Sequence, residues 1–178
     1  SNKKGKLFDF LEKIHFNFFL KNNFKFLKDK NLPLVLDIGS GNGEFLVKLS
    51  KFFSLEMYGI DFSKTACQNM IKKKINAYHG VFLDYPEKKK FDMISMNNYI
   101  EHVIDPLSEL KKAHDCLNKG GKLIGITDNF DSIDRIIFQK YWAGNHAPRH
   151  TFLFSPKVLK ETLKKAGFNN VVVKQDIN

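Results

Sequence analysis

A glycine-rich turn between a short apolar run and a helical pattern is the part of the sequence best suited to bind a ligand. Residues 35–45 read Val-Leu-Asp-Ile-Gly-Ser-Gly-Asn-Gly-Glu-Phe. Gly39, Gly41 and Gly43 let the backbone bend sharply and approach a ligand where a Cβ would collide. The helix start that follows offers unpaired N–H groups to polar ligand atoms. This segment therefore predicts a turn that cradles a small polar ligand.

Two acids accompany this turn. Asp37 directly precedes the glycines, and Asp61 ends the next apolar run. Asp61 follows the glycines by about 20 residues, the spacing at which an acid reaches the two hydroxyls of a ribose. Strand, glycine turn, helix, strand and acid together predict a nucleoside-binding βαβ unit. Two other roles stay open, because Asp37 could stabilise the turn through backbone N–H groups and Asp61 could cap the next helix.

The residues from 36 to 43 resemble the first motif of the class I S-adenosylmethionine (SAM)-dependent methyltransferases, which reads hydrophobic-Asp-x-Gly-x-Gly-x-Gly. Dinucleotide enzymes usually carry Gly-x-Gly-x-x-Gly, which this turn does not fit. The resemblance runs from about residue 34 to about residue 168, through the stretches 91–94, 101–106 and 117–123. Together these stretches are similar to the small-molecule methyltransferases that include the ubiquinone-biosynthesis O-methyltransferases. The resemblance implies SAM as cofactor and S-adenosylhomocysteine as product.

The same resemblance implies where the cofactor lies. Its methionine part would contact the glycine turn, with Asp37 near its amino group, and Asp61 would accept from both ribose hydroxyls. Many family members carry an acid after the third strand for the adenine amino group, where this chain has Val81, so backbone groups would serve there instead. The implied cofactor-binding residues are Asp37, Gly39, Ser40, Gly41, Gly43, Asp61, Phe62, Val81, Phe82, Met96 and Asn97.

Two histidines are candidate catalytic bases, because the ordinary pKa of histidine lies near working pH. His102 follows the fourth strand, and His150 lies in an aromatic loop after the fifth. That loop also carries Trp142, His146 and Arg149, which we expect to bind the acceptor by stacking and by pairing with an anionic group. The alternatives are a buried structural role for His102 and a loop whose histidine and arginine only bond the backbone.

We predict no metal site. Some quinone O-methyltransferases carry Glu-x-x-Glu-His before the fourth helix, which indicates a metal, but Asn98 occupies the first acidic position here. Cys67 and Cys116 are too few and too far apart for a zinc site or a disulfide framework.

Alternating strand and helix patterns predict an α/β fold with a doubly wound, mostly parallel, Rossmann-like sheet. We expect strands at 34–38, 57–61, 77–82, 91–96 and 122–127, a sixth beginning at 171–174, and helices at 44–52, 63–74, 106–117 and 155–166. Gly120 and Gly121 would stop the third of these helices. The sequence offers no seventh, antiparallel strand of the kind usual in the family. We therefore expect the sheet to lack it, through truncation, an early end of the ordered part, or a different closure.

We divide the chain at residue 32. Residues 1–32 form an N-terminal, aromatic-rich helical segment that packs on the sheet or caps the site, and residues 33–178 form the SAM-binding domain. Leu7, Leu11, Ile14 and Phe18 fall on one helical face. Interleaved lysines leave open a basic amphipathic surface for an anionic membrane or a lipid-linked substrate.

Composition limits the partners. The formal charge is +10, yet Arg135 and Arg149 are the only arginines, which favours a solvated lysine surface over a nucleic-acid site. We find no apolar run of about 18 residues and no signal peptide. We expect a cytoplasmic protein with a small-molecule partner, no nucleic acid, no membrane span and at most weak membrane-surface contact. The oligomeric state stays open.

These features predict a SAM-dependent methyltransferase that acts on a small molecule such as a sugar, a phenol or a related metabolite, at oxygen or nitrogen. Because the sulfonium already activates the methyl group, alignment of the acceptor supplies much of the rate. Two alternatives stay open. One is an RNA methyltransferase, favoured by the charge, and the other is a non-catalytic protein with a SAM-binding fold.

Overall fold

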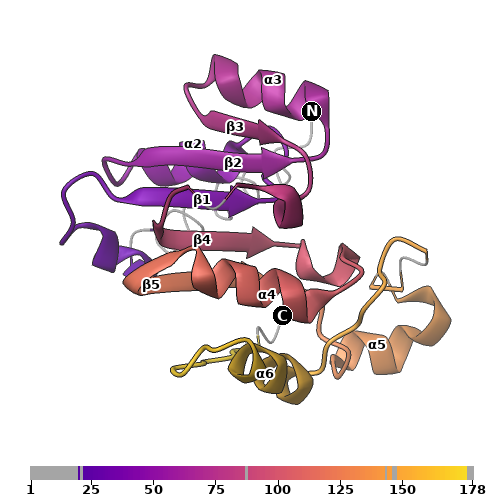
Figure 1. The fold of residues 1–178 in the computed structure, drawn as a ribbon. Coiled ribbons are helices and arrows are strands. Elements are labelled where there is room, and N and C mark those ends of the chain that lie inside the picture. Colours follow the sequence, from indigo (N-terminus) through magenta and orange to yellow (C-terminus); the bar gives the residue numbers. More distant parts are fainter. Residues whose placement is uncertain (1–19, 21, 87, 143, 146–147, 176–178) are drawn as a thin grey trace, which may run out of the picture.

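The computed structural model describes residues 20, 22–86, 88–142, 144–145 and 148–175. Within them, five strands form one sheet in the order β3-β2-β1-β4-β5, and every pair is parallel. In Figure 1 the arrows of β1, β2, β3 and β4 point the same way. The strands are β1 (Leu34–Ile38), β2 (Glu56–Asp61), β3 (Asn76–His79), β4 (Phe91–Asn97) and β5 (Leu117–Ile126). The expected doubly wound parallel fold is confirmed.

The strand order reverses between β1 and β4. The chain runs outward from β1 through β2 to β3, then crosses to the other side of β1 and continues with β4 and β5. In such sheets, ligands bind outside the carboxyl ends of the strands at the point of reversal. In the register Asp37 pairs with Ser95 and Ile38 with Met96, so the glycine turn leaves the sheet at this reversal.

Both faces of the sheet are covered. Along β1, Val35 joins the cluster with Leu46 of α2 (Glu44–Ser50) and Met70 of α3 (Lys64–Lys72). Leu36 joins the cluster with Leu110 of α4 (Pro106–Asp115), against which α6 (Pro156–Lys165) also packs. In Figure 1, α4 crosses in front of β4 and β5, and α2 lies behind the sheet. Burial on both faces explains why the strands read as near-continuous apolar runs.

Three helices start where the sequence predicts. Ser63, Asp105 and Ser155 each accept a hydrogen bond from a backbone N–H of the first turn, at 3.3, 3.1 and 3.3 Å. Pro106 and Pro156 occupy the first helical positions, where a missing N–H costs nothing. These caps confirm the starts of α3, α4 and α6.

The described end of the N-terminal segment is part of the core. Leu20, Phe24 and Leu27 are almost fully buried and pack in the cluster that contains Val35, and Lys25–Leu27 form the short 3-10 helix η1. The predicted helical face with Leu7, Leu11, Ile14 and Phe18 falls on residues 1–19, which lie outside the described residues. The division at residue 32 stays a prediction. No helix in the described part of the chain is long and apolar enough to cross a bilayer.

Two expectations about the last strands are wrong. Residues 171–174 form no strand, because β5 pairs only with β4 and no described strand lies beyond it to offer a partner. Gly120 and Gly121 lie within β5 instead of ending α4, which stops at Asp115. The pairing of β4 with β5 is irregular there. Phe91 pairs with Leu117 and Met93 with Lys122, so the segment 117–122 of β5 lies opposite only residues 91–93 of β4.

Three 3-10 helices and one short α-helix lie in the segments that follow β3, β4 and β5. Phe82–Asp84 form η2 where the end of the third strand was expected, and Ile100–His102 form η3. After β5 come α5 (Ile133–Phe138) and the 3-10 helix η4 (Gln139–Tyr141). Neither α5 nor η4 buries a residue.

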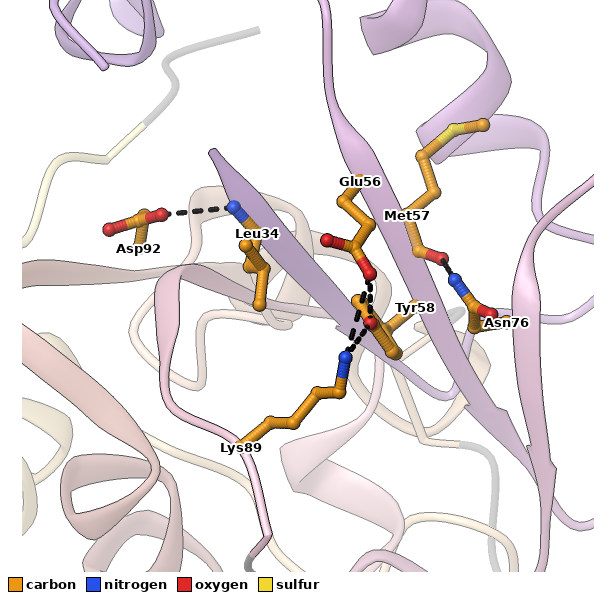
Figure 2. Close-up of polar contacts among 7 residues, drawn as sticks. All are labelled: Leu34, Glu56, Met57, Tyr58, Asn76, Lys89 and Asp92. Atoms are coloured by element: carbon orange, nitrogen blue, oxygen red, sulfur yellow. Dashed lines mark hydrogen bonds and ion pairs between the residues drawn. The ribbon is translucent and has the colours of Figure 1, made fainter. Parts of the chain in front are cut away.

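At the amino edge of the sheet, Asp92 joins three segments. One carboxylate oxygen accepts from the Leu34 N–H at 2.9 Å, and the other accepts from Lys30 at 2.8 Å and from Asn118 at 2.9 Å. Figure 2 shows the bond to Leu34, and beside it the cluster in which Lys89 meets Glu56 and the Tyr58 hydroxyl. Burial alone would raise the pKa of Asp92, but these hydrogen bonds outweigh it and hold that pKa below its usual range.

Asp92→Ala should lower the free energy of unfolding by about 1–3 kcal/mol, because it leaves the Leu34 N–H and the Asn118 amide without their acceptor. Lys30→Ala, which removes only the half-exposed ion pair, should cost about 0–1 kcal/mol. Urea unfolding measures both. Because the folded pKa of Asp92 is depressed, its contribution is present above the unfolded pKa of about 3.9 and is lost as pH falls through the folded value. Equal stability of wild type and Asp92→Ala at pH 7 would contradict this account.

Candidate active site

The glycine turn has the backbone that its sequence predicts. Gly39, Gly41 and Gly43 have φ values of +68°, +51° and +75°. A Cβ at Gly43 would lie 2.4 Å from the Ile75 side chain, and one at Gly39 would lie 2.7 Å from the Tyr99 ring. At Gly41 a Cβ would meet nothing within 4 Å. Packing therefore requires glycine at 39 and 43, while the turn is open at Gly41.

Asp61 connects this turn to the next helix. Its two carboxylate oxygens accept the N–H groups of Gly41 and Ser63, each at 2.8 Å, and the residue is only 8% exposed. The sequence left a ribose contact and a role at the helix start open, and the bond to Ser63 is of the second kind. Each oxygen has two lone pairs, so ribose hydroxyls can still be accepted. The ribose contact stays a prediction.

Asp37 is a buried carboxyl group beside the turn. The residue is 3% exposed, and the Ser95 hydroxyl donates to it at 2.6 Å. Burial raises the pKa of Asp37 to about 7; the Ser95 bond opposes this rise and the charge of Asp61 adds to it. A cation placed next to Asp37 would favour its ionised form. Asp37 therefore suits the recognition of a positively charged group.

Exposed apolar side chains follow β2 and β3 at the same edge. Phe62 is 78% exposed and Val81 is 50% exposed, directly beside buried Asp61 and Phe82. The Gly80 N–H donates to the carbonyl of Asp61 at 3.1 Å, which joins the two strand ends. Isolated exposed apolar residues are common, but a pair beside a buried acid suits the faces of a flat heterocycle.

The end of β4 lies next to the glycine turn. Met96 pairs with Ile38 in the register and is 3% exposed, and Asn97 is half-buried. The following residue, Asn98, has a φ of +48°, so the chain turns sharply where it leaves the sheet. Met96 and Asn97 thus lie at the reversal point, and their contact with the cofactor stays a prediction.

The two candidate bases lie together although they are far apart in sequence. The rings of His102 and His150 contact edge to face, with centroids 4.7 Å apart. Glu101, 2% exposed, accepts from the Thr127 hydroxyl at 3.0 Å, and its carbonyl accepts from the Thr151 N–H at 2.8 Å. These bonds tie η3 after β4 to the loop after β5, and they explain how the two histidines are brought together.

Hydrogen bonds select the tautomers of both histidines. Nδ1 of His150 lies 2.8 Å from the carbonyl of Gly144, and Nδ1 of His102 lies 3.0 Å from the carbonyl of Arg149. Because a carbonyl only accepts, each Nδ1 carries the hydrogen in the neutral ring, which leaves the lone pair on Nε2. A carboxylate oxygen of Asp128 lies 3.4 Å from Nδ1 of His150. These contacts fix the orientation of both imidazole rings, and a role as a base stays a prediction.

One carboxylate and two imidazoles also form a set that divalent transition metals accept. Ligand atoms of Glu101, His102 and His150 all lie within 4.8 Å of one another. The sequence argument against a metal considered only the residues around His102, and it could not see that His150 joins them. The absence of a metal stays a prediction.

The rest of the acceptor loop is divided between the interior and the surface. Trp142 is 8% exposed, and its ring packs against Gly144, where a Cβ would lie 2.3 Å from it. Arg149 is exposed. His146 lies outside the described residues. The structure thus brings His150 to the edge of the sheet, while the contacts expected of Trp142, His146 and Arg149 with an acceptor stay predictions.

Sequence reasoning missed four residues of this region. Ser95 bonds Asp37, Thr127 bonds Glu101, Asp128 faces His150, and Tyr99 packs on Gly39. Thr127 ends the expected fifth strand and Asp128 directly follows it, a position that in open α/β sheets points to ligand contact. Ser95 and Tyr99 carry no comparable signal, because their partners are distant in sequence.

A methyltransferase domain family matches residues 9–173. An uncharacterised protein of Methanocaldococcus jannaschii is 30% identical over 144 residues, which cover 80% of this chain and 67% of the relative. The tRNA U34 carboxymethyltransferase of Aliarcobacter butzleri is 28% identical over 83% of this chain and 50% of its own length. The ubiquinone biosynthesis O-methyltransferase of Cereibacter sphaeroides is 28% identical over 83% and 67%. The chain thus spans about half to two thirds of these relatives.

Among solved structures, the plantazolicin methyltransferase BpumL in complex with a pentazolic desmethylPZN analog and S-adenosylhomocysteine is similar in fold. Its TM-score is 0.69 at 20% sequence identity, and the match covers 90% of this chain and 66% of that one. At this identity the likeness shows the fold alone.

SAM binding should depend on the ionisation of Asp37. SAM carries a sulfonium and an ammonium group, which favour the carboxylate, so binding near pH 7 should release a proton. Affinity should rise with pH up to about 7, by at most about tenfold per pH unit, and level off above it. Calorimetry in two buffers of different ionisation enthalpy measures the release.

Asp37→Asn is the matched variant, because an amide oxygen can still accept from Ser95. It should bind SAM more weakly at pH 8 and release no proton from this position. A wild type whose affinity is flat between pH 6 and 8 would contradict this role.

Proposed function

Since the chain belongs to the class I SAM-dependent methyltransferases, we propose that it transfers the methyl group of SAM to a hydroxyl or amine of a small molecule. One observation carries the choice of acceptor atom. His102, His150 and buried Glu101 meet at the carboxyl edge that also bears the glycine turn and Asp61. A base beside the cofactor is useful when the acceptor must lose a proton.

We propose the following division of labour. Asp37, Asp61 and the glycine turn hold the cofactor, with its adenine beside Phe62 and Val81. When bound, SAM supplies an already activated methyl group, so the main tasks of the protein are to align the acceptor and to exclude water. Because SAM itself supplies the electrophilic methyl group, neither task requires an electrophilic group on the protein.

In this proposal Nε2 of His150 takes the proton of the acceptor. The Gly144 carbonyl fixes its ring, and the carboxylate of Asp128, 3.4 Å from Nδ1, stabilises the imidazolium that forms. The ring of His102, in the segment after β4, packs edge to face against the ring of His150, and His102 is the second candidate base. Exposed Arg149, adjacent in sequence to His150, supports an anionic acceptor such as a sugar phosphate or a phenol, because guanidinium pairs strongly with oxyanions.

RNA is the second candidate acceptor. One of the relatives is named a tRNA U34 carboxymethyltransferase, and the formal charge of this chain is +10. Cationic proteins bind nucleic acid through counterion release, which makes the affinity fall steeply with salt. The near absence of arginine is the observation against it, since bidentate pairing with phosphate is a property of arginine.

His150→Ala should lower the methylation rate by about 10²–10⁴-fold, the usual contribution of a general base, and leave SAM affinity within about twofold. His114→Ala is the matched control, because this exposed histidine of α4 packs on Phe168 away from the candidate bases. Transfer of labelled methyl from SAM to a panel of phenols, sugar phosphates and folded tRNA provides the rate. A His150→Ala protein that methylates at the wild-type rate would exclude His150 as the base.

The same assay separates the remaining alternatives. A chelator should leave the rate unchanged if the histidines act through protons, whereas a loss restored by a divalent cation would show that they act through a metal. Methylation of tRNA alone, together with salt-sensitive binding, would replace the small-molecule acceptor by RNA. SAM binding without transfer to any of these acceptors would favour a non-catalytic role.

A further inference from the structure

Tyr99 lies behind the proposed cofactor site and packs against its methionine end. It follows Asn98, the residue with a φ of +48° at the end of β4. The three heavy atoms nearest to a Cβ built on Gly39 all belong to Tyr99, at 2.7, 3.5 and 3.5 Å. The tyrosine ring thus supports the first bend of the glycine turn directly.

The hydroxyl of Tyr99 reaches the adenine end. It interacts with the carboxyl group of Glu109 and with the backbone of Phe82. Burial, followed by the charge and hydrogen bond of Glu109, raises the pKa of Tyr99, whereas the Phe82 bond lowers it. Because a carboxylate only accepts, we infer that the Tyr99 hydroxyl is the donor toward Glu109 and that the Phe82 N–H is the donor toward Tyr99.

Lys112, one turn after Glu109 in α4, binds the segment 82–85 that begins with Phe82. Its ammonium group donates to the carbonyls of Leu83 and Tyr85, at 2.6 and 2.7 Å, and lies 5.5 Å from the centroid of the Phe82 ring. Residues 82–85 are therefore held by one face of α4. Tyr99 connects that face to the glycine turn on the other side of the reversal point.

Glu109 is the buried end of this chain of bonds. The residue is 4% exposed, and among the described residues its second carboxylate oxygen has no hydrogen-bond partner. Burial raises the pKa of Glu109 to about 7, although the Tyr99 bond and the charge of Lys112 lower it; the charge of Asp105 adds to the rise. Both protonation states are thus populated near neutral pH.

We propose that Tyr99 and Glu109 are positioning residues that couple the two ends of the cofactor site, so that the glycine turn and residues 82–85 hold the cofactor in one common arrangement. This inference rests on the proposed placement of the cofactor. Neither residue needs to touch the reacting atoms. Their effect passes through Gly39 on one side and through Phe82 on the other.

The coupling should depend on pH. A carboxylate accepts the Tyr99 hydroxyl more strongly than a neutral acid does, so the coupling strengthens as pH rises through about 7. The charged and titratable groups that face Glu109 are Tyr99, Lys112 and Asp105. Neither Asp105 nor Tyr99 changes protonation in that range, since the pKa of Asp105 lies below its usual range and that of Tyr99 is raised above its ordinary value near 10.

The test uses adenosine and SAM as calorimetric probes between pH 6 and 8. Adenosine lacks the amino-acid part, so it does not report the ionisation of Asp37. Tyr99→Phe keeps the ring and removes only the hydroxyl, and Glu109→Gln removes the titration. Tyr58→Phe is the matched control, because that hydroxyl bonds Lys89 at 2.5 Å at the opposite edge of the sheet (Figure 2).

At pH 8, Tyr99→Phe and Glu109→Gln should each weaken adenosine binding about 3–10-fold, and the double variant should bind no more weakly than either single one, because both act through one chain of bonds. The rise of adenosine affinity between pH 6 and 8 should be smaller in Glu109→Gln than in wild type. Tyr58→Phe should bind as wild type. Melting curves check that each variant is folded.

Three results would overturn the coupling. They are wild-type affinity in both single variants, additive losses in the double variant, and an unchanged pH profile in Glu109→Gln. If Glu109→Gln fails to fold, Tyr99→Phe with its intact ring decides the matter through its adenosine affinity alone. A wild type that binds neither probe would overturn the proposed cofactor site as well, whereas normal SAM binding with unaffected variants would overturn only the coupling.

Discussion

The contacts of Asp61 and Tyr99 at the carboxyl edge of the sheet depend on the left-handed backbone at Gly39, Gly41 and Gly43. Because these three positions bend the chain within five residues, the Gly41 N–H can meet Asp61 of the neighbouring strand at 2.8 Å. The same bend allows the Tyr99 ring to approach Gly39 more closely than any Cβ would permit. The glycines thus position an acid on one side of the reversal point and an aromatic support on the other.

Three buried carboxyl groups differ in how many hydrogen-bond donors surround them. At the amino edge, Asp92 has three donors, and its pKa is held below the usual range. Asp37 in β1 and Glu109 in α4 have fewer donors than a buried carboxylate requires, and burial raises the pKa of each to about 7. A buried charge without enough partners is costly. Such groups are frequent where a ligand or a proton completes the set.

Local signals predicted the parts of the fold that local chemistry decides. The first strand, the glycine turn and the capped helix starts after Ser63, Asp105 and Ser155 were readable, because each depends on neighbouring residues. Residues 171–174 have a strand pattern, but a strand also needs a partner, which a single segment does not reveal. The glycines of β5 read as a helix stop, because a bulge and a cap both use residues that bend the backbone easily.

The contacts that assemble the site are almost all long-range. His102 and His150 meet only because threonine hydroxyls and backbone groups tie the segment after β4 to the loop after β5. A parallel sheet guarantees that both segments leave at the same edge, but it does not decide which side chains meet there. The cofactor side is built on strand ends and short turns, whose geometry the sheet fixes. The proposed acceptor side is built on the long loop after β5, so its chemistry can change while the fold stays the same. This difference explains why the motifs of this sequence identify the cofactor so much more sharply than the acceptor.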